Sequence, residues 1–190
     1  MVKRLIIGMS GASGAPLTVE LLRQHHDRCP EVETHLIVTK GGEMTLAQET
    51  GMALAEIQKL ASVSHSNSNI GAAPASGSFK SMGMIVVPCS MKTVAGVVSG
   101  YSDNLLLRAA DVMMKERRKL VLVAREAPLS TVHLRNLYEA SQLGAVILPP
   151  MLTYYNGPQS LDDCTRHTVN RILSQFDLDE GSYQWEGMEI

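Results

Sequence analysis

Residues 8–15 combine small residues with hydroxyl groups in a way that suits an anionic ligand. They read Gly-Met-Ser-Gly-Ala-Ser-Gly-Ala and join an apolar run to an amphipathic stretch. Small residues let the backbone approach a ligand closely, a helix beginning here presents N–H groups to an anion, and Ser10 and Ser13 add hydroxyl donors. The spacing is neither the G-x-G-x-x-G of a dinucleotide site nor the Gly-Lys-Ser/Thr of a P-loop. A tight turn needs glycine in any case, but the segment favours a mononucleotide such as FMN over NAD or ATP.

A second segment, residues 88–93, follows another apolar run in the same manner and reads Pro-Cys-Ser-Met-Lys-Thr. Ser90 and Thr93 offer hydroxyls at a helix N-terminus, which suits a second side of the same ligand. Thr39, after a third apolar run, adds a hydroxyl at the same sheet edge. Cys89 could be a nucleophile, but no histidine near it in sequence could activate it, so a small buried residue is the favoured interpretation.

Charged residues recur at helical spacing between residues 104 and 118. Arg108, Asp111 and Lys115 are three and four positions apart, so they share one face of a helix. That face is either a solvated row of ion pairs or a cationic face directed at an anionic ligand, and composition does not decide between the two.

Arg125 and Glu126 come directly after the apolar run 120–123. The two charges could simply neutralise each other at the end of a buried strand. Alternatively, Arg125 binds a phosphate bidentately and Glu126 transfers protons, with Tyr155 and Arg171 joining a phosphate clamp. No histidine pairs with Cys, Asp or Glu at a metal-ligand spacing, so the sequence predicts no metal site.

The elements that must position these residues alternate along the chain. Five apolar runs rich in β-branched residues predict strands buried on both faces of a parallel sheet, at residues 5–7, 36–38, 84–87, 120–123 and 145–148. Amphipathic stretches between and after them predict helices at 15–28, 44–60, 104–118, 131–142 and 161–175. Alternation of this kind predicts an open, doubly wound α/β sheet, in which ligands bind beyond the carboxyl ends of the strands.

Composition excludes several classes of protein. With 190 residues, 45% hydrophobic and 19% charged, the chain is expected to form one compact soluble domain, 1–190. A net charge of −2 gives no reason to expect nucleic acid or an anionic membrane as a partner. Three scattered cysteines and no apolar N-terminal stretch predict a cytoplasmic location. The Ser-, Asn- and Gly-rich segment 62–81 is expected to be a functional loop, and the tail 177–190 a lid or subunit arm.

In their order along nearly the whole chain, eight short segments resemble the UbiX family of flavin prenyltransferases. Each is weak evidence alone, but the ordered set is specific. The matching segments are 11–15 (Gly-Ala-Ser-Gly-Ala), 49–50, 74–78 (Pro-Ala-Ser-Gly-Ser), 88–90, 108–112, 115–118 (Lys-Glu-Arg-Arg), 123–128 and 143–149.

The resemblance implies a three-layer, Rossmann/flavodoxin-like fold and a homododecamer whose sites form between subunits. Such enzymes join a dimethylallyl group from dimethylallyl phosphate to reduced FMN without a metal. The prenylated FMN then serves a UbiD-type decarboxylase of aromatic acids.

Carried over by position, the resemblance also implies a set of site residues. The FMN contacts would be Gly11, Ala12, Ser13, Thr39, Ser90, Met91, Lys92, Thr93, Arg108 and Arg125. The phosphate clamp would be Lys115, Glu126, Tyr155 and Arg171, and the catalytic groups Ser13, Glu49, Glu126 and Lys115. Ile70 departs from the pattern, because family members often carry Trp there. The large side chains of Met91 and Lys92 also depart from it and are expected to point away from the flavin.

Two other functions compete with this one. An FMN-dependent cysteine decarboxylase would need a histidine after the first strand-helix unit, where this chain has Glu49, although His65 leaves the possibility open. A non-catalytic flavin carrier for an aromatic acid decarboxylase would keep the FMN loops and could lose the phosphate clamp.

Overall fold

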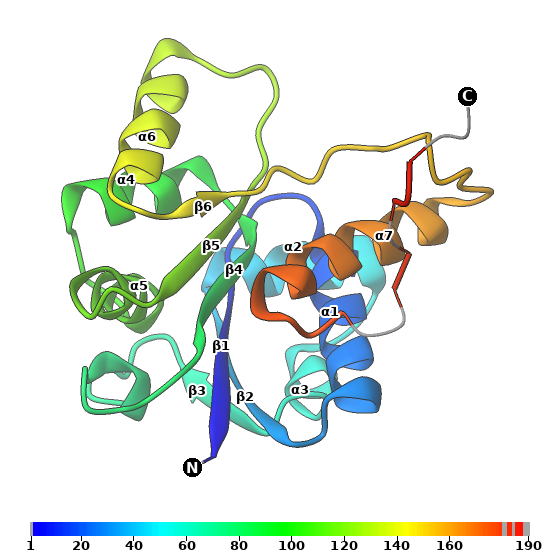
Figure 1. Ribbon diagram of the computed structural model, residues 1–190. Helices are drawn as coiled ribbons and strands as arrows, with labels where there is room; N and C mark the ends of the chain where they lie inside the picture. Colours follow the sequence, from blue (N-terminus) through cyan, green and yellow to red (C-terminus); the bar gives the residue numbers. More distant parts are fainter. Residues whose placement is uncertain (1, 180–181, 184, 188–190) are drawn as a thin grey trace.

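A single parallel sheet forms the centre of the protein. The computed structural model describes residues 2–179, 182–183 and 185–187, so part of the predicted tail arm, 180–181, 184 and 188–190, lies outside the described residues. All five strand pairings are parallel, and the strand order is β3-β2-β1-β4-β5-β6 (Figure 1). The strands are β1 Lys3–Met9, β2 Val32–Val38, β3 Val63–Ser66, β4 Gly83–Cys89, β5 Lys119–Ala124 and β6 Val146–Ile147.

Seven α-helices connect and follow these strands in the described part of the chain. They are α1 Ala15–Arg28, α2 Lys40–Thr50, α3 Leu54–Gln58, α4 Met91–Ser99, α5 Leu105–Lys115, α6 Thr131–Gln142 and α7 Leu161–Leu173, with 3-10 turns at Ala73–Ala75 and Ser174–Phe176. The predicted helix 44–60 was wrong as one element. Gly51, whose φ of 70° is left-handed, ends α2, and the chain restarts as α3.

Two elements were missing from the predicted strands and helices, although a helix N-terminus was expected at Ser90. β3 is a four-residue edge strand inside the segment expected to be a loop. The helix α4 is apolar over most of its length, so its sequence shows no polar face. Its N-cap Ser90 and the left-handed Gly100 after it set its ends.

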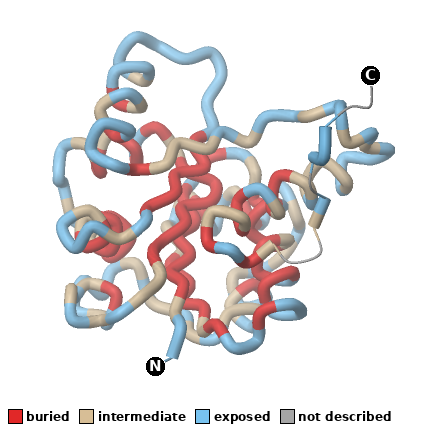
Figure 2. Tube along the Cα trace, in the orientation of Figure 1, coloured by how far each residue is buried: buried red, intermediate tan, exposed pale blue. Residues whose placement is uncertain are grey.

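Two apolar clusters cover the two faces of the sheet, because alternate residues of each strand point in opposite directions. Leu5 and Ile7 of β1 belong to the cluster packed with α1, α2, α3 and α7. Ile6 belongs to the cluster packed with α4, α5 and α6. The buried strands run through the middle of the molecule in Figure 2. The prediction of a three-layer, doubly wound fold is confirmed.

The strand order positions the site. β1 lies between β2 and β4, so the chain leaves β1 toward one side of the sheet and later returns on the other side. The loops after β1, β2 and β4 therefore meet at the carboxyl edge, at the switch point where ligands bind in such sheets. No helix within the described residues is long and apolar enough to cross a membrane.

Candidate active site

The buried hydroxyl of Ser10 joins the two loops that the sequence singled out. Its Oγ donates to the carbonyl oxygen of Pro88 at 3.0 Å and accepts from the backbone N–H of Ser90 at 2.8 Å. Ser90 in turn caps α4 by accepting from the N–H of Thr93. The glycine-rich loop, with Gly11, Ala12 and Ser13, is thus fixed beside the first turn of α4.

The loop after β2 is attached to the same place. Thr39 donates its N–H to the carbonyl of Met9 and caps α2 by accepting from Gly42. Gly11 and Gly41 touch, since a Cβ on Gly11 would lie 2.9 Å from the Cα of Gly41. Small residues therefore bring three loops together at the switch point, and we call this junction the cradle.

Glu49 occupies the N-terminus of α1. Its Oε2 accepts from the N–H groups of Gly14 and Ala15 at 2.9 and 2.8 Å. The expectation that this helix presents free N–H groups to an anionic ligand was therefore wrong for these two residues. A carboxylate from α2 is favoured there because it meets the positive end of the helix dipole.

These contacts keep Glu49 ionised. Partial desolvation raises the pKa of Glu49, but hydrogen bonds from the Ser13 hydroxyl and from the N–H groups of Gly14 and Ala15, with the charge of Arg125, lower it further. The net pKa of Glu49 lies below its ordinary value. At neutral pH its carboxylate accepts a hydrogen bond from Ser13 and has no proton to give.

A cavity of about 530 Å³ opens beside this carboxylate, and we call it the Ser13 cavity. Ser13, Glu49 and Arg125 are polar lining residues, and Asp162, Thr165 and Thr168 of α7 are further ones. Apolar side chains of α1, α7 and the arm after β6 supply most of the remainder, namely Pro16, Leu17, Pro150, Leu152 and Leu161, with Cys164 among the other lining residues. A polar end facing an apolar wall suits a flat ring with a polar edge.

The other residues of the second loop point away from this cavity. The side chain of Met91 is buried in the core. That of Lys92 lines a separate groove between α4 and α6. Cys89 is fully buried, and desolvation raises the pKa of its thiol far above the ordinary value. The prediction that Cys89 is a small buried residue is confirmed.

Tyr155 and Arg171 line a second cavity of about 480 Å³, the Tyr155 cavity. It lies against another face of α7, because His167, Asn170 and Arg171 face it whereas Cys164 and Thr168 face the Ser13 cavity. The Tyr155 hydroxyl is 3.2 Å from Nε2 of His167. Sequence reasoning missed His167, although its spacing of four residues from Arg171 on a predicted helix was a usable signal.

The structure does not bring the remaining predicted residues to either cavity within one chain. Lys115, at the end of α5, pairs with Glu116 at 2.6 Å. Arg108 pairs with Asp111 at 2.5 Å and donates to the carbonyl of Ala75. The Arg108–Asp111 pair matches the ion-pair interpretation of this helix face, whereas Lys115 pairs with the next residue along the chain. Glu126 is exposed and accepts from the N–H of Ala127.

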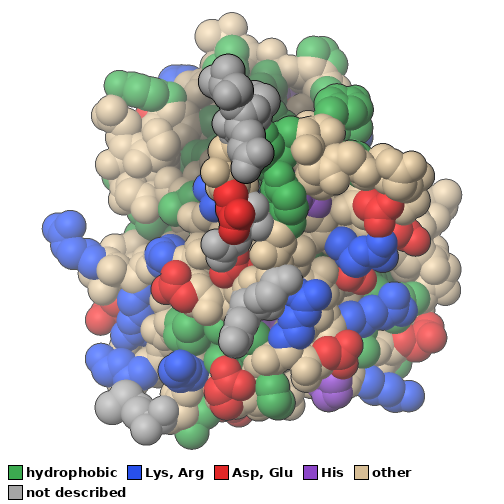
Figure 3. Space-filling view, turned by 45° about the vertical axis from the view of Figure 1, so that its right-hand side comes forward, with side chains coloured by type: hydrophobic (Ala, Val, Ile, Leu, Met, Phe, Trp, Pro, Cys, Tyr) green, Lys and Arg blue, Asp and Glu red, His purple; other side chains and the backbone are tan. Residues whose placement is uncertain are grey.

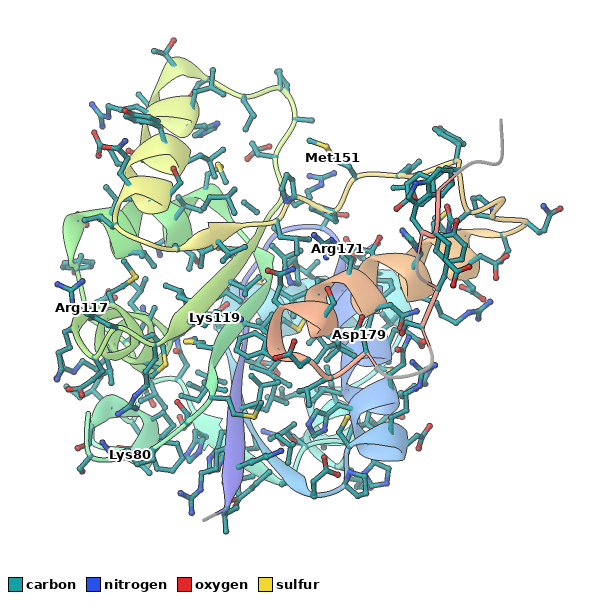
Figure 4. All side chains as sticks on the ribbon, in the orientation of Figure 1. Lys80, Arg117, Lys119, Met151, Arg171 and Asp179 are labelled. Atoms are coloured by element: carbon teal, nitrogen blue, oxygen red, sulfur yellow. The ribbon has the colours of Figure 1, made fainter. Side chains whose placement is uncertain are left out.

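Lys115 lies at the amino end of the parallel strands, and Arg125 lies at their carboxyl end. Lys115 precedes the start of β5, and Arg125 follows its end. A six-residue strand separates the two positions by more than about 15 Å. Figure 4 shows Arg117, two residues after Lys115, on the other side of the view from Met151.

Similarity to known proteins identifies the family. The flavoprotein family model matches residues 2–173. A probable UbiX-like flavin prenyltransferase of Sedimentibacter hydroxybenzoicus is 49% identical over 97% of both chains. Flavin prenyltransferase UbiX of Escherichia coli strain K12 is 49% identical over 98% of this chain and 100% of its own. The chain belongs to the UbiX-like flavin prenyltransferase family.

Solved structures of this family share the fold. A dodecameric FMN-dependent UbiX-like decarboxylase from Escherichia coli O157:H7 superposes with a TM-score of 0.94 at 48% identity, over 97% of this chain and 100% of that one. AnUbiX (PadA1), in complex with FMN and dimethylallyl pyrophosphate, gives 0.95 at 45% identity over the full length of both. The resemblance and the fold class predicted from the sequence are confirmed. The cysteine decarboxylase SpaF, at 16% identity and a TM-score of 0.59, shares the fold alone.

Proposed function

We propose that this protein transfers a dimethylallyl group from dimethylallyl phosphate to reduced FMN and releases prenylated FMN. The observation that carries the proposal is the Ser13 cavity, in which an ionised Glu49 and Arg125 face an apolar wall at the carboxyl edge of the sheet. Family membership over nearly the full length supports the same function.

The cradle at the switch point would hold FMN. The residues proposed to contact it are Gly11, Ala12, Ser13, Thr39, Ser90, Met91, Lys92, Thr93 and Arg125, with Arg108 supplied by another copy of the chain. Reduced flavin, when bound, supplies the electron-rich N5 and C6 atoms to which the prenyl group is joined. Met91 and Lys92 would contribute backbone contacts, because their side chains point elsewhere.

The protein's own groups have three tasks in this reaction. The apolar wall of the Ser13 cavity excludes water from a reactive allyl group. Ser13 and Glu49 can take up a proton, because the Glu49 carboxylate is held ionised beside the Ser13 hydroxyl. Arg171, Tyr155 and Lys115 would stabilise negative charge on the departing phosphate, and Glu126 beside them would transfer a proton.

A complete phosphate clamp needs more than one copy of the chain, because Lys115 lies at the opposite edge of the sheet. We propose a homododecamer with sites between subunits, as the dodecameric relative suggests. In the view of Figure 3, hydrophobic side chains gather in the upper half of the molecule and most charged side chains lie in the lower half. The exposed apolar residues on and around α6 and the arm would pack against other copies, namely Leu129, Val132, Leu134, Tyr138, Leu143, Met151 and Leu152.

The tail would act as an arm over the second cavity. The ring of Trp185 lies 5.6 Å from that of Tyr155, and the ring of Tyr183 lies 6.1 Å from it. We further propose a cytoplasmic location, one domain over residues 1–190, and a UbiD-type decarboxylase of aromatic acids as the recipient of the product.

The competing functions have less support. The histidine that a cysteine decarboxylase would require is absent from the described lining of the Ser13 cavity. His65 lies instead in β3, where its Nε2 is 2.9 Å from Nδ1 of His35. A carrier subunit would have no reason to hold Tyr155 and Arg171 in one cavity.

Phosphate release tests the proposal. The purified protein is incubated without oxygen with reduced FMN and dimethylallyl phosphate, and inorganic phosphate is measured. We expect release only when protein, reduced flavin and donor are all present. With dimethylallyl pyrophosphate as the alternative donor, the released group that is measured is pyrophosphate. Release from neither donor, or release that does not depend on flavin, would contradict the proposal.

A further inference from the structure

We propose that His167 is a positioning residue that turns the Tyr155 hydroxyl toward the phosphate of the prenyl donor. The inference rests on the proposed function, in which Tyr155 and Arg171 bind that phosphate. It starts from one contact: Nε2 of His167 lies 3.2 Å from the hydroxyl oxygen of Tyr155. The two rings meet edge to face, with centroids 5.7 Å apart.

Helix geometry places His167 and Arg171 together. They are four residues apart on α7, so they occupy neighbouring positions on one face. Both line the Tyr155 cavity, as does the amide side chain of Asn170. Tyr155 reaches the same cavity from the arm before α7, so His167 connects the arm to the helix.

The chemistry of the ligand decides the direction of the hydrogen bond. A phosphate oxygen only accepts, so every group that binds it must donate. The Tyr155 hydroxyl has a single proton. If that proton went to His167, none would remain for the phosphate. If the N–H at Nε2 of His167 donates instead, the Tyr155 proton is free for the ligand. The hydrogen bond from His167 to Tyr155 then polarises the one from Tyr155 to the phosphate.

The surroundings of the pair favour this arrangement. The guanidinium of Arg171 donates to Ser174 and keeps further donors for an anion. Asp179 also lines the cavity, and its negative charge would repel a phosphate. The groups that donate hydrogen bonds must therefore be well oriented to bind one. The ring of Tyr183 lies 6.3 Å from that of His167, and Trp185 packs on Tyr155. These rings surround the bond between His167 and Tyr155 on the side of the tail, although Tyr155 itself stays exposed in a single chain.

The test is a set of four variants of the FMN-loaded protein, with Arg171→Ala as a fifth that tests the phosphate clamp, all kept in air so that the flavin stays oxidised and no transfer occurs. His167→Gln keeps an N–H donor, His167→Leu removes it, Tyr155→Phe removes the hydroxyl, and the fourth combines the last two. Dimethylallyl phosphate binding is measured by calorimetry. Fluorescence of Trp185, the only tryptophan in the chain, is a second readout because it packs on Tyr155. Circular dichroism checks that each variant is folded.

We expect His167→Leu and Tyr155→Phe each to weaken donor binding by about tenfold, the effect of losing one hydrogen bond to a charged group. His167→Gln should stay within about threefold of the unaltered protein, since its amide N–H replaces that of the imidazole. The double variant should bind no more weakly than Tyr155→Phe, because His167 acts through Tyr155.

Three results would overturn the inference. These are unchanged binding in His167→Leu, equal losses in His167→Gln and His167→Leu, and additive losses in the double variant. If neither Tyr155→Phe nor Arg171→Ala weakens binding, the phosphate clamp of the proposed function is itself wrong. The behaviour of Tyr155→Phe and Arg171→Ala therefore separates the two failures.

Discussion

At the scale of single residues, Glu49 is stabilised by two kinds of hydrogen-bond donor and by one positive charge. It accepts from two N–H groups of α1, from the Ser13 hydroxyl, and faces the charge of Arg125. Glu49 and Ser13 were predicted as catalytic from the resemblance, but their mutual position was not predictable from spacing. The contact joins Glu49 to Gly14, 35 residues earlier, and depends on how α2 packs beside α1.

Glu49→Gln removes the charge and keeps the shape of the side chain. The amide can still accept from Gly14 and Ala15, so FMN should bind within about threefold of the normal affinity. The single-turnover rate of prenyl transfer should fall about 10²- to 10³-fold, which is typical for loss of one preorganised group. Glu43→Gln, an exposed change on the same helix, is the control. Normal turnover in Glu49→Gln would remove Glu49 from the mechanism.

At the scale of elements, the five apolar runs predicted five strands because strands buried on both faces leave a strong signal. The loops were predictable only in part. The glycine of residue 11 suggested a ligand, but the structure shows that Gly11 also packs on Gly41. No local pattern reveals such a contact, since it joins loops that follow different strands.

Gly11→Ala tests whether contact between these loops is needed for the site. A Cβ on Gly11 would lie 2.9 Å from backbone of Gly41, and backbone cannot rotate away as a side chain can. The loops must separate, so FMN affinity measured by flavin fluorescence should fall more than about tenfold. Gly71→Ala is the matched control, because its nearest neighbour would be a side-chain oxygen at 3.6 Å. Equal FMN affinity in both variants would contradict this view of the loops.

The two histidines that join β2 to the edge strand β3 are expected to make the stability of the protein depend on pH. Burial lowers the pKa of His35 and of His65, which join β2 to β3, while Glu33 opposes the shift at His35. Both histidines stay neutral in the folded protein at a pH where the unfolded chain takes up protons. Their stabilising effect is therefore complete above about pH 6.5, the pKa of histidine in the unfolded chain. It is lost as the pH falls from there toward the lowered pKa values that the two histidines have in the folded protein.

His65→Gln keeps a partner for His35 and removes one titrating group. The loss of unfolding free energy between pH 7.5 and 5.5, measured with urea, should be smaller in this variant than in the unaltered protein. Some dependence should remain, because burial also lowers the pKa of His25 on α1. An equal loss in both proteins would show that the pair on β2 and β3 does not titrate as described.

At the scale of the whole molecule, residues predicted for one site lie at two edges of the sheet. Lys115 comes before β5, and Ser13, Glu49 and Arg125 gather at the other edge. Through the resemblance, the sequence indicated these residues and sites formed between subunits, but it did not say which of the residues one chain fails to bring together. That requires the direction of α5 relative to the sheet.

Subunit complementation tests this division. Lys115→Ala and Glu49→Gln should each be nearly inactive alone. When the two variants are co-expressed and assemble at random, about a quarter of the sites receive both normal residues from different copies. Activity should then recover to a corresponding fraction. No recovery in verified mixed assemblies would mean that both residues serve a site within one chain.

The mass of the flavin after reaction tests the central claim most directly. The protein is incubated without oxygen with reduced FMN and dimethylallyl phosphate, and the released flavin is measured by mass spectrometry. We predict a flavin heavier by one C5 unit, formed by the unaltered protein and much more slowly by Glu49→Gln. Recovery of only unmodified FMN, with the pyrophosphate donor also tried, would contradict prenyl transfer.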